Sequence, residues 1–92
     1  MKRYQQLALD AKSLLEKHGW IQNDIGNKRR GFCIMGAVQE AKFLGGYKAV
    51  SYNTLRERIK ESTLCNTPTM WNDEKGRTKE EILSVLDKVS KI

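Results

Sequence analysis

The sequence predicts a compact, mostly all-α single domain spanning residues 1–92, with about four helices around a buried central helix. Three segments repeat apolar residues at the i, i+3, i+4, i+7 spacing of one helical face. A fourth segment, 33–44, is apolar almost all round and is the predicted central helix. The connections are too long for a simple up-and-down bundle, and no internal repeat is present.

The first predicted helix runs over residues 2–17 and stops at Gly19, a common C-terminal residue of helices. Its apolar stripe consists of Tyr4, Leu7, Ala8, Ala11, Leu14 and Leu15. Residues 20–30 are polar and contain turn signals. A small hairpin is expected at residues 20–32, with Trp20–Ile21 as one strand and Gly31–Phe32 as its return.

The central helix is expected from Cys33 to Leu44, with Gly45–Gly46 ending it. Five residues share its inward face: Ile34, Ala37, Val38, Ala41 and Leu44. Cys33, Met35 and Phe43 fill most of the remaining surface, so this helix is expected to be buried nearly all round.

The third predicted helix begins with Ser51 as N-cap and ends before the break at residues 65–68. Residues 69–77 are expected to form a loop with apolar anchors. Thr78 and Glu81 have the spacing of a capping box and open the last helix. Its inward stripe is expected to consist of Ile82, Val85, Leu86, Val89 and Ile92.

The net charge of +6 favours an anionic partner, which could be a nucleotide, a nucleic acid or an acidic protein surface. Solubility alone is the other interpretation, since the basic residues are scattered. Cys33 and Cys65 show no paired spacing, and no signal peptide or membrane-length apolar run is visible. A cytoplasmic protein with reduced thiols and no membrane association is therefore expected.

An anion site is expected where Lys28, Arg29 and Arg30 lead through Gly31 to the start of the central helix. The first amides of a helix lack internal partners and carry partial positive charge, which suits a phosphate. Gly31 would let the ligand approach the backbone. The alternative is a solvated basic loop.

A second candidate segment contains Trp71, Asn72, Asp73, Arg77 and Thr78. The indole of Trp71 offers a stacking face, and the polar side chains after it could recognise a base or ribose edge. The alternative is structural, with Trp71 anchoring the loop and Asn72–Asp73 forming a turn. If this loop and the basic loop converge beside Cys33 and Trp20, the two sites become one pocket.

Catalytic and metal sites have little support in the sequence. His18 and Cys33 could form a thiol–imidazole pair, but burial opposes a thiolate and no third residue completes a triad. One histidine and two separated cysteines match no zinc spacing, and no cofactor is expected. Acidic residues interrupt the basic face of the third helix, so only weak, phosphate-driven nucleic-acid binding is expected.

Three pieces of the sequence together resemble a family of short, uncharacterised actinobacterial and bacteriophage proteins, a domain of unknown function. They are Gly19–Trp20, then Phe32–Ala37 with Ala41, and Trp71–Asp73 followed by Thr78, Glu81, Leu83 and Leu86–Asp87. The resemblance implies a small, mostly helical domain and no particular activity. The chain departs from the family pattern in its Lys28–Arg30 run and its basicity.

The leading functional hypothesis is a non-enzymatic binding protein, phage-encoded, that sequesters a small anionic, nucleotide-like ligand in a counter-defence role. Its predicted contacts are Trp20, Lys28, Arg29, Arg30, Gly31, Cys33, Trp71, Asn72, Asp73, Arg77 and Thr78. The alternatives are a protein-interaction module that inhibits a host protein and a nucleic-acid-binding accessory protein. Self-association into a homo-oligomer is left open.

Overall fold

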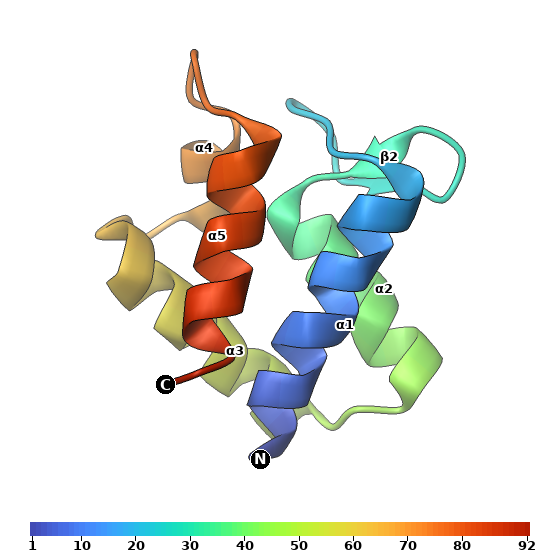
Figure 1. Cartoon of the computed structure of the whole chain (residues 1–92), viewed down its shortest axis with the longest axis vertical. Helices are drawn as coiled ribbons and strands as arrows, with labels where there is room; N and C mark the ends of the chain where they lie inside the picture. The colour runs from blue at the N-terminus through green and yellow to red at the C-terminus, as the bar shows by residue number, and fades with distance from the viewer.

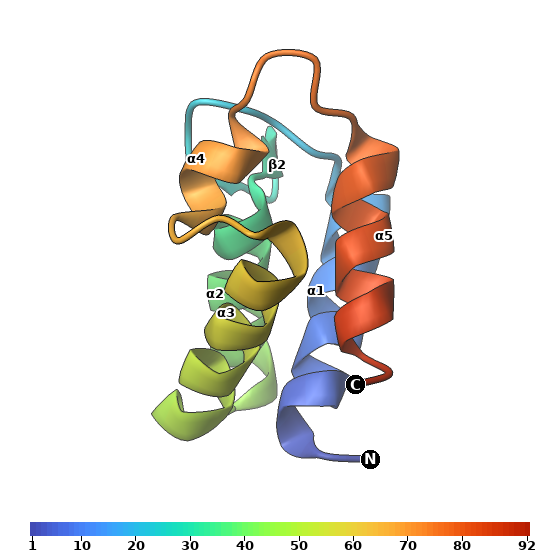
Figure 2. The ribbon, with the colours of Figure 1, turned by 90° about the vertical axis from the view of Figure 1, so that its left-hand side faces the viewer.

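A computed structural model describes residues 1–92 as five helices and a two-stranded hairpin. The elements are α1 (Arg3–His18), β1 (Gly26–Asn27), β2 (Gly31–Phe32), α2 (Ile34–Gly45), α3 (Ala49–Thr63), α4 (Pro68–Asn72) and α5 (Lys79–Val89). They form two layers, with α1 and α5 in one and α2, α3 and α4 in the other (Figures 1 and 2). The mostly helical single domain predicted from the sequence is confirmed.

The helix that organises the packing is α1, because it lies against α2, α3 and α5. Most of its apolar stripe is buried as predicted: Leu7, Ala8, Ala11 and Leu15 are completely inaccessible, and Leu14 is half-buried. At its start the Lys2 backbone N–H donates to Gln5 Oε1 at 2.7 Å. The expectation that the helix after Gly31 would be the central one is corrected, since α2 packs mainly against α1 and does not pack extensively on α5.

The predicted hairpin exists within residues 20–32, but its strands differ from those expected. Gly26 pairs with Phe32 and Asn27 pairs with Gly31 in antiparallel register. Trp20 forms only an isolated parallel bridge with Phe32. The three residues 28–30 close the hairpin between Asn27 and Gly31, a common loop length, so the nearer segment becomes the partner strand.

The first part of α2 is buried all round, and its last turn is not. Cys33 is the N-cap, and each residue from Ile34 to Val38 is buried. Phe43 and Leu44, however, are 80% and 53% exposed. The prediction that Leu44 faces inward and that Phe43 is covered is therefore wrong, because no other element packs over this end of α2, which stands out at the side of the molecule (Figure 1).

The boundaries of α3 and α5 show two further corrections. Lys48, not Ser51, is the N-cap of α3, because the connection after Gly46 needs only the buried Tyr47 before the helix resumes. Thr78 caps α5 with the predicted capping box. The helix ends at Val89, so Ile92 lies beyond it and is exposed rather than inward-facing.

The stretch predicted as a loop over residues 69–77 contains the short helix α4. Pro68 occupies its first position, where a fixed φ and a missing N–H are tolerated. The turn is too short to show an apolar period, which is why the sequence does not reveal it. No helix combines the length and the apolar composition that crossing a membrane requires.

Candidate functional site

Two connections that are far apart in the sequence meet at the first turn of α2. One is the segment 20–23 that follows α1, and the other is the end of α4. Both lie at the same end of the molecule as β2 (Figures 1 and 2). The centre of this junction is the fully buried side chain of Asn72. The segment that meets the end of α4 is thus 20–23, whereas the pocket hypothesis required the Lys28–Gly31 loop to do so.

All four hydrogen-bonding positions of the Asn72 amide are occupied by the chain itself. Its Oδ1 accepts from the indole Nε1 of Trp20 at 2.7 Å and from the backbone N–H of Ile34 at 2.9 Å. Its Nδ2 donates to the carbonyl of Ile21 at 3.1 Å and to Asp73 Oδ1 at 2.9 Å. Asn72 thus ties α4 to the start of α2 and has no free group for a ligand.

The residues beside Asn72 strengthen the same junction. Asp73 Oδ1 also accepts from the backbone N–H of Asn23 at 2.8 Å. Gln22 Nε2 donates to the carbonyls of Asn72 and Glu74, each at 3.0 Å. The segment 20–23 is therefore held to the α4 corner through both side chains and backbone.

The start of α2 offers little to an anion because three of its four first amides already have acceptors in the chain, among them that of Ile34. The N–H of Cys33 donates to the Ile25 carbonyl at 3.2 Å, and that of Gly36 donates to Cys33 Sγ at 3.2 Å. A Cβ on Gly36 would lie 2.0 Å from the Ile25 carbonyl oxygen. The space beside Gly31 that was predicted for a ligand is filled by the chain itself. A Cβ on Gly31 would lie 2.7 Å from the Gly19 carbonyl oxygen.

The basic run lies on the hairpin turn and is partly neutralised. Arg30 Nη1 donates to Asp24 Oδ2 at 2.5 Å, and this bond holds the pKa of the Asp24 carboxyl below its usual range. Lys28 Nζ lies 3.6 Å from Glu40 Oε2. The guanidinium of Arg29 forms no ion pair, although its backbone N–H is held by Asn27 Oδ1. One free arginine remains of the three predicted cations.

Trp71, Arg77 and Thr78 form a separate structural cluster. The Arg77 guanidinium lies 4.1 Å from the centre of the Trp71 ring, within the range of a cation–π interaction. Arg77 also pairs with Glu74 and Glu81, and the Arg77 bond is the main reason that the pKa of Glu81 is lowered. Arg77 therefore covers one face of the Trp71 ring that was predicted to stack on a base.

A hollow of about 280 Å³ does lie at this end of the molecule. Its lining residues are Asn23, Asp24, Ile25, Cys33, Thr69 and Asp73. Two carboxylates and no cation line it, so it does not favour an anion. Burial raises the pKa of the Cys33 thiol, which keeps it protonated. None of the three surface hollows is lined by Trp20, Trp71 or Arg30.

The thiol–imidazole pair of His18 and Cys33 that was considered from the sequence is not formed in the structure. The ring of His18 packs edge-to-face against Phe32, with 6.1 Å between ring centres. No hydrogen bond joins His18 to Cys33, and no cluster of three metal-ligating side chains is present. Cys33 instead serves as the N-cap of α2.

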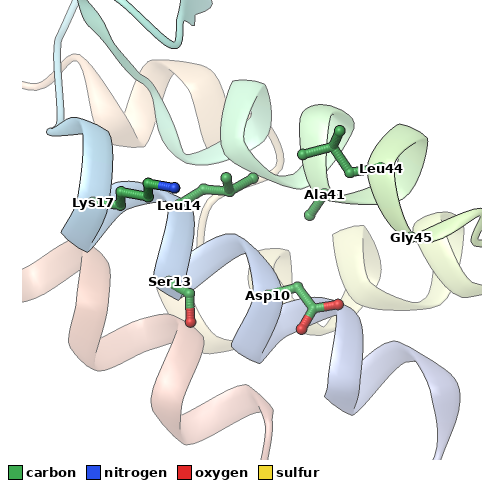
Figure 3. A pocket seen from close by; sticks show the side chains of 7 residues that line it. All are labelled: Asp10, Ser13, Leu14, Lys17, Ala41, Leu44 and Gly45. Carbon is green, nitrogen blue, oxygen red and sulfur yellow. The ribbon is translucent and has the colours of Figure 1, made fainter.

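A feature that the sequence analysis missed lies at the opposite end of α2. Leu44 lines a groove of about 340 Å³ between α1 and α2, together with Ala41 and Leu14. Figure 3 shows these side chains with Lys17 toward one end of the groove and Asp10 toward the other. Phe43 lines a second groove of about 350 Å³ with Tyr52, Gln39 and Lys42.

The available signal for this surface was the position of Phe43 and Leu44 directly before two glycines. In the structure these two residues extend past the packed part of α2, which ends at Ala41. An apolar period predicts such residues to be core, because the sequence of one helix does not show where its neighbour ends.

Comparison with known proteins identifies the chain only at the level of its family. A model for a family of unknown function (DUF6197) matches residues 2–91. Because this match covers almost the whole chain, the chain belongs to that family. No curated protein and no solved structure gives a significant match.

Proposed function

We propose that this member of a family of unknown function is a small protein-binding module whose docking surface is the uncovered C-terminal end of α2. We call the surface formed by Phe43 and Leu44, with the grooves on either side of them, the α2 ridge. The observation that carries the proposal is the 80% and 53% exposure of these two residues on a helix whose first turns are buried.

The physical argument is the cost of leaving these side chains in water. Covering a large apolar side chain completely is worth about 1.5–3 kcal/mol, and nothing in the chain covers Phe43. Isolated exposed apolar residues are common on soluble proteins. Here, however, two adjacent ones each line a different groove, which gives a partner apolar contacts on both sides of one helix.

Sequestration of an anionic, nucleotide-like ligand stays a prediction with weaker support. The first-turn amides of Ile34 and Gly36 and the side-chain amide of Asn72 are used within the chain, and carboxylates line the nearby hollow. A thermal-shift panel of nucleotides tests it. Stabilisation that is lost in Arg29→Ala and Arg30→Ala would favour ligand binding over the protein-binding function.

The proposed function is tested by site-specific photo-cross-linking in the native host cells. Benzoylphenylalanine replaces Phe43 in one version and Leu64 in a control version. Leu64 is 93% exposed but lies just beyond the far end of α3, away from the α2 ridge. We expect one protein, identified by mass spectrometry, to cross-link from position 43 and not from position 64.

Purified components then decide whether that cross-link reflects binding. The captured protein should bind the wild-type chain with at least tenfold higher affinity than it binds Leu44→Ser. Equal cross-linking from both positions, or equal affinity of both chains, would contradict the proposal.

Three further predictions concern the identity of the partner, nucleic-acid binding and self-association. In a phage-encoded chain acting in the host cytoplasm, the partner would be a host protein that the module inhibits, in a counter-defence role. Weak nucleic-acid binding predicts an affinity for duplex DNA that falls steeply with salt. Self-association is tested by sedimentation of the free chain.

A further inference from the structure

The groove between α1 and α2 carries opposite charges at its two ends. Lys17 lies at one end and Asp10 lies toward the other (Figure 3). We infer that this groove pairs with the same groove of a second copy of the chain, rotated by half a turn, so that Lys17 of each copy faces Asp10 of the other. The inference goes beyond the function proposed above, because it assigns the α1–α2 side of the α2 ridge to a second copy. The Phe43–Tyr52 side is left to the other protein.

The two charges at the ends of the groove have no counter-charge within the chain. Lys17 is exposed, and neither Lys17 nor Asp10 forms an ion pair. The Asp10 carboxylate accepts from the Tyr47 hydroxyl and from Gln6 Nε2, two neutral groups that hold it in place and leave its negative charge. Each end of the groove therefore favours a group of the opposite charge from outside the chain.

The spacing of the groove residues on α1 suits a twofold axis. Four of them stand at i, i+3, i+4 and i+7 and so form one stripe along the helix: Asp10, Ser13, Leu14 and Lys17. The stripe is about 10 Å long. A twofold axis through its middle brings each end of the stripe against the opposite end in the other copy. The small side chain of Ser13 lies near this axis, where the two α1 helices come closest.

The same arrangement covers the exposed apolar residue of the groove. Leu44 is 53% exposed and lies toward the Asp10 end, whereas Leu14 lies next to Lys17 (Figure 3). The half turn therefore brings Leu44 of each copy toward the Lys17 end of the other copy. There the alkyl chain of Lys17 and the half-buried Leu14 offer apolar contact. Apolar contacts with charge pairs at their margin are the usual composition of a protein interface.

A segment of one charge sign fits the groove less well than a second copy does. An acidic helix would place carboxylates beside Asp10, and a basic helix would place ammonium groups beside Lys17. The net charge of +6 opposes self-association, but at about 0.15 M salt, charges more than about 8 Å apart are largely screened. Because a contact through one groove is small for a protein interface, we expect a dimer Kd on the order of 100 µM.

Charge reversal with complementation tests this arrangement. Asp10→Lys gives a groove with two cations, and Lys17→Asp gives one with two carboxylates. Each variant should self-associate at least tenfold more weakly than wild type in sedimentation equilibrium. An equimolar mixture places a cation against a carboxylate at both ends, so we expect a heterodimer with a Kd within about threefold of the wild-type value. The ¹⁵N-labelled Asp10→Lys chain should show amide shifts at residues 10–17 and 41–45 only when Lys17→Asp is added.

Two controls separate this contact from general charge effects and from misfolding. Lys88→Asp makes the same charge change as Lys17→Asp at an exposed, unpaired lysine of α5, and its self-association should stay within about twofold of wild type. Asp10→Asn keeps an acceptor oxygen for Tyr47 and removes only the charge, so it should weaken the dimer about threefold. Thermal melts establish which variants fold. Lys17→Asp and Asp10→Asn carry the test if Asp10→Lys does not fold.

Four results would overturn the inference. They are a wild-type chain that stays monomeric up to about 1 mM, equal effects of Lys17→Asp and Lys88→Asp, a mixture that associates no better than either variant alone, and amide shifts confined to the Phe43–Tyr52 groove. None of them changes the cross-link expected from position 43 to another protein. Loss of that selective cross-link, with complementation intact, refutes the protein-binding function and leaves the dimer.

Discussion

Replacing Asn72 by alanine should destabilise the protein more than any other single asparagine substitution. The change removes both polar atoms of a fully buried amide and leaves three groups of the main fold without a partner. They are the indole N–H of Trp20, the backbone N–H of Ile34 and the carbonyl of Ile21. The mutation thus disconnects α4 from both α2 and the segment after α1.

The size of the effect follows from how deeply each of these groups is buried. An unsatisfied buried group costs about 1–3 kcal/mol, so the inaccessible Ile34 N–H should cost about 2 kcal/mol. Trp20 and Ile21 are half-buried and partly reach water, so each should cost about 1 kcal/mol. The sum of about 4 kcal/mol is a large share of the roughly 5–10 kcal/mol expected for a domain of this size.

Urea denaturation followed by far-UV circular dichroism measures this loss, and a melting temperature lower by about 20 °C should accompany it. Asn66→Ala is the matched control, because Asn66 is exposed, and it should stay within about 0.5 kcal/mol of wild type. Asn72→Asp provides a second check. Burial should raise the pKa of the new carboxyl, so its destabilisation should be smaller at pH 4 than at pH 7. A loss below about 1 kcal/mol for Asn72→Ala would refute the role given to Asn72.

Three other substitutions test separate features. Gly36→Ala should destabilise the fold by about 2 kcal/mol in the same urea assay, because its Cβ would meet the Ile25 carbonyl oxygen at 2.0 Å; a gain from helix propensity would contradict this. Leu64→Gly should stabilise it by about 0.5–1 kcal/mol, since Leu64 holds a φ of +54°, and an unchanged unfolding midpoint would argue against that strain. Burial and the Asp10 carboxylate raise the pKa of Tyr47 from 10 to about 12, so its stabilising contribution is full below pH 10 and fades as pH rises through 12. The stability difference between wild type and Tyr47→Phe should therefore shrink over that range, and a difference independent of pH would exclude this linkage.

The sequence predicts the parts of the fold that depend on local signals. The apolar period of residues 4–15 gives α1, and the Thr78–Glu81 spacing gives the start of α5. Cys33 was correctly expected in the core, although its role as the N-cap of α2 depends on the position of the Gly36 amide. These features are encoded within a few residues of one another.

What the sequence does not predict depends on where other elements end. Phe43 and Leu44 fit the apolar pattern of a core helix, but the packing stops at Ala41. Asn72 and Trp20 are 52 residues apart, so neither reveals the hydrogen bond between them. The candidate binding surface therefore lies at the end of α2 opposite to the one that the sequence analysis favoured.

The first turn of α2 is held within the chain, and we propose that its last turn binds the partner. The most direct test is an amide chemical-shift map of the ¹⁵N-labelled chain with the protein captured through position 43. We expect the largest shifts to fall on residues 41–46 and the signals of residues 28–36 to be unaffected. Shifts centred on residues 28–36, with residues 41–46 unchanged, would contradict it.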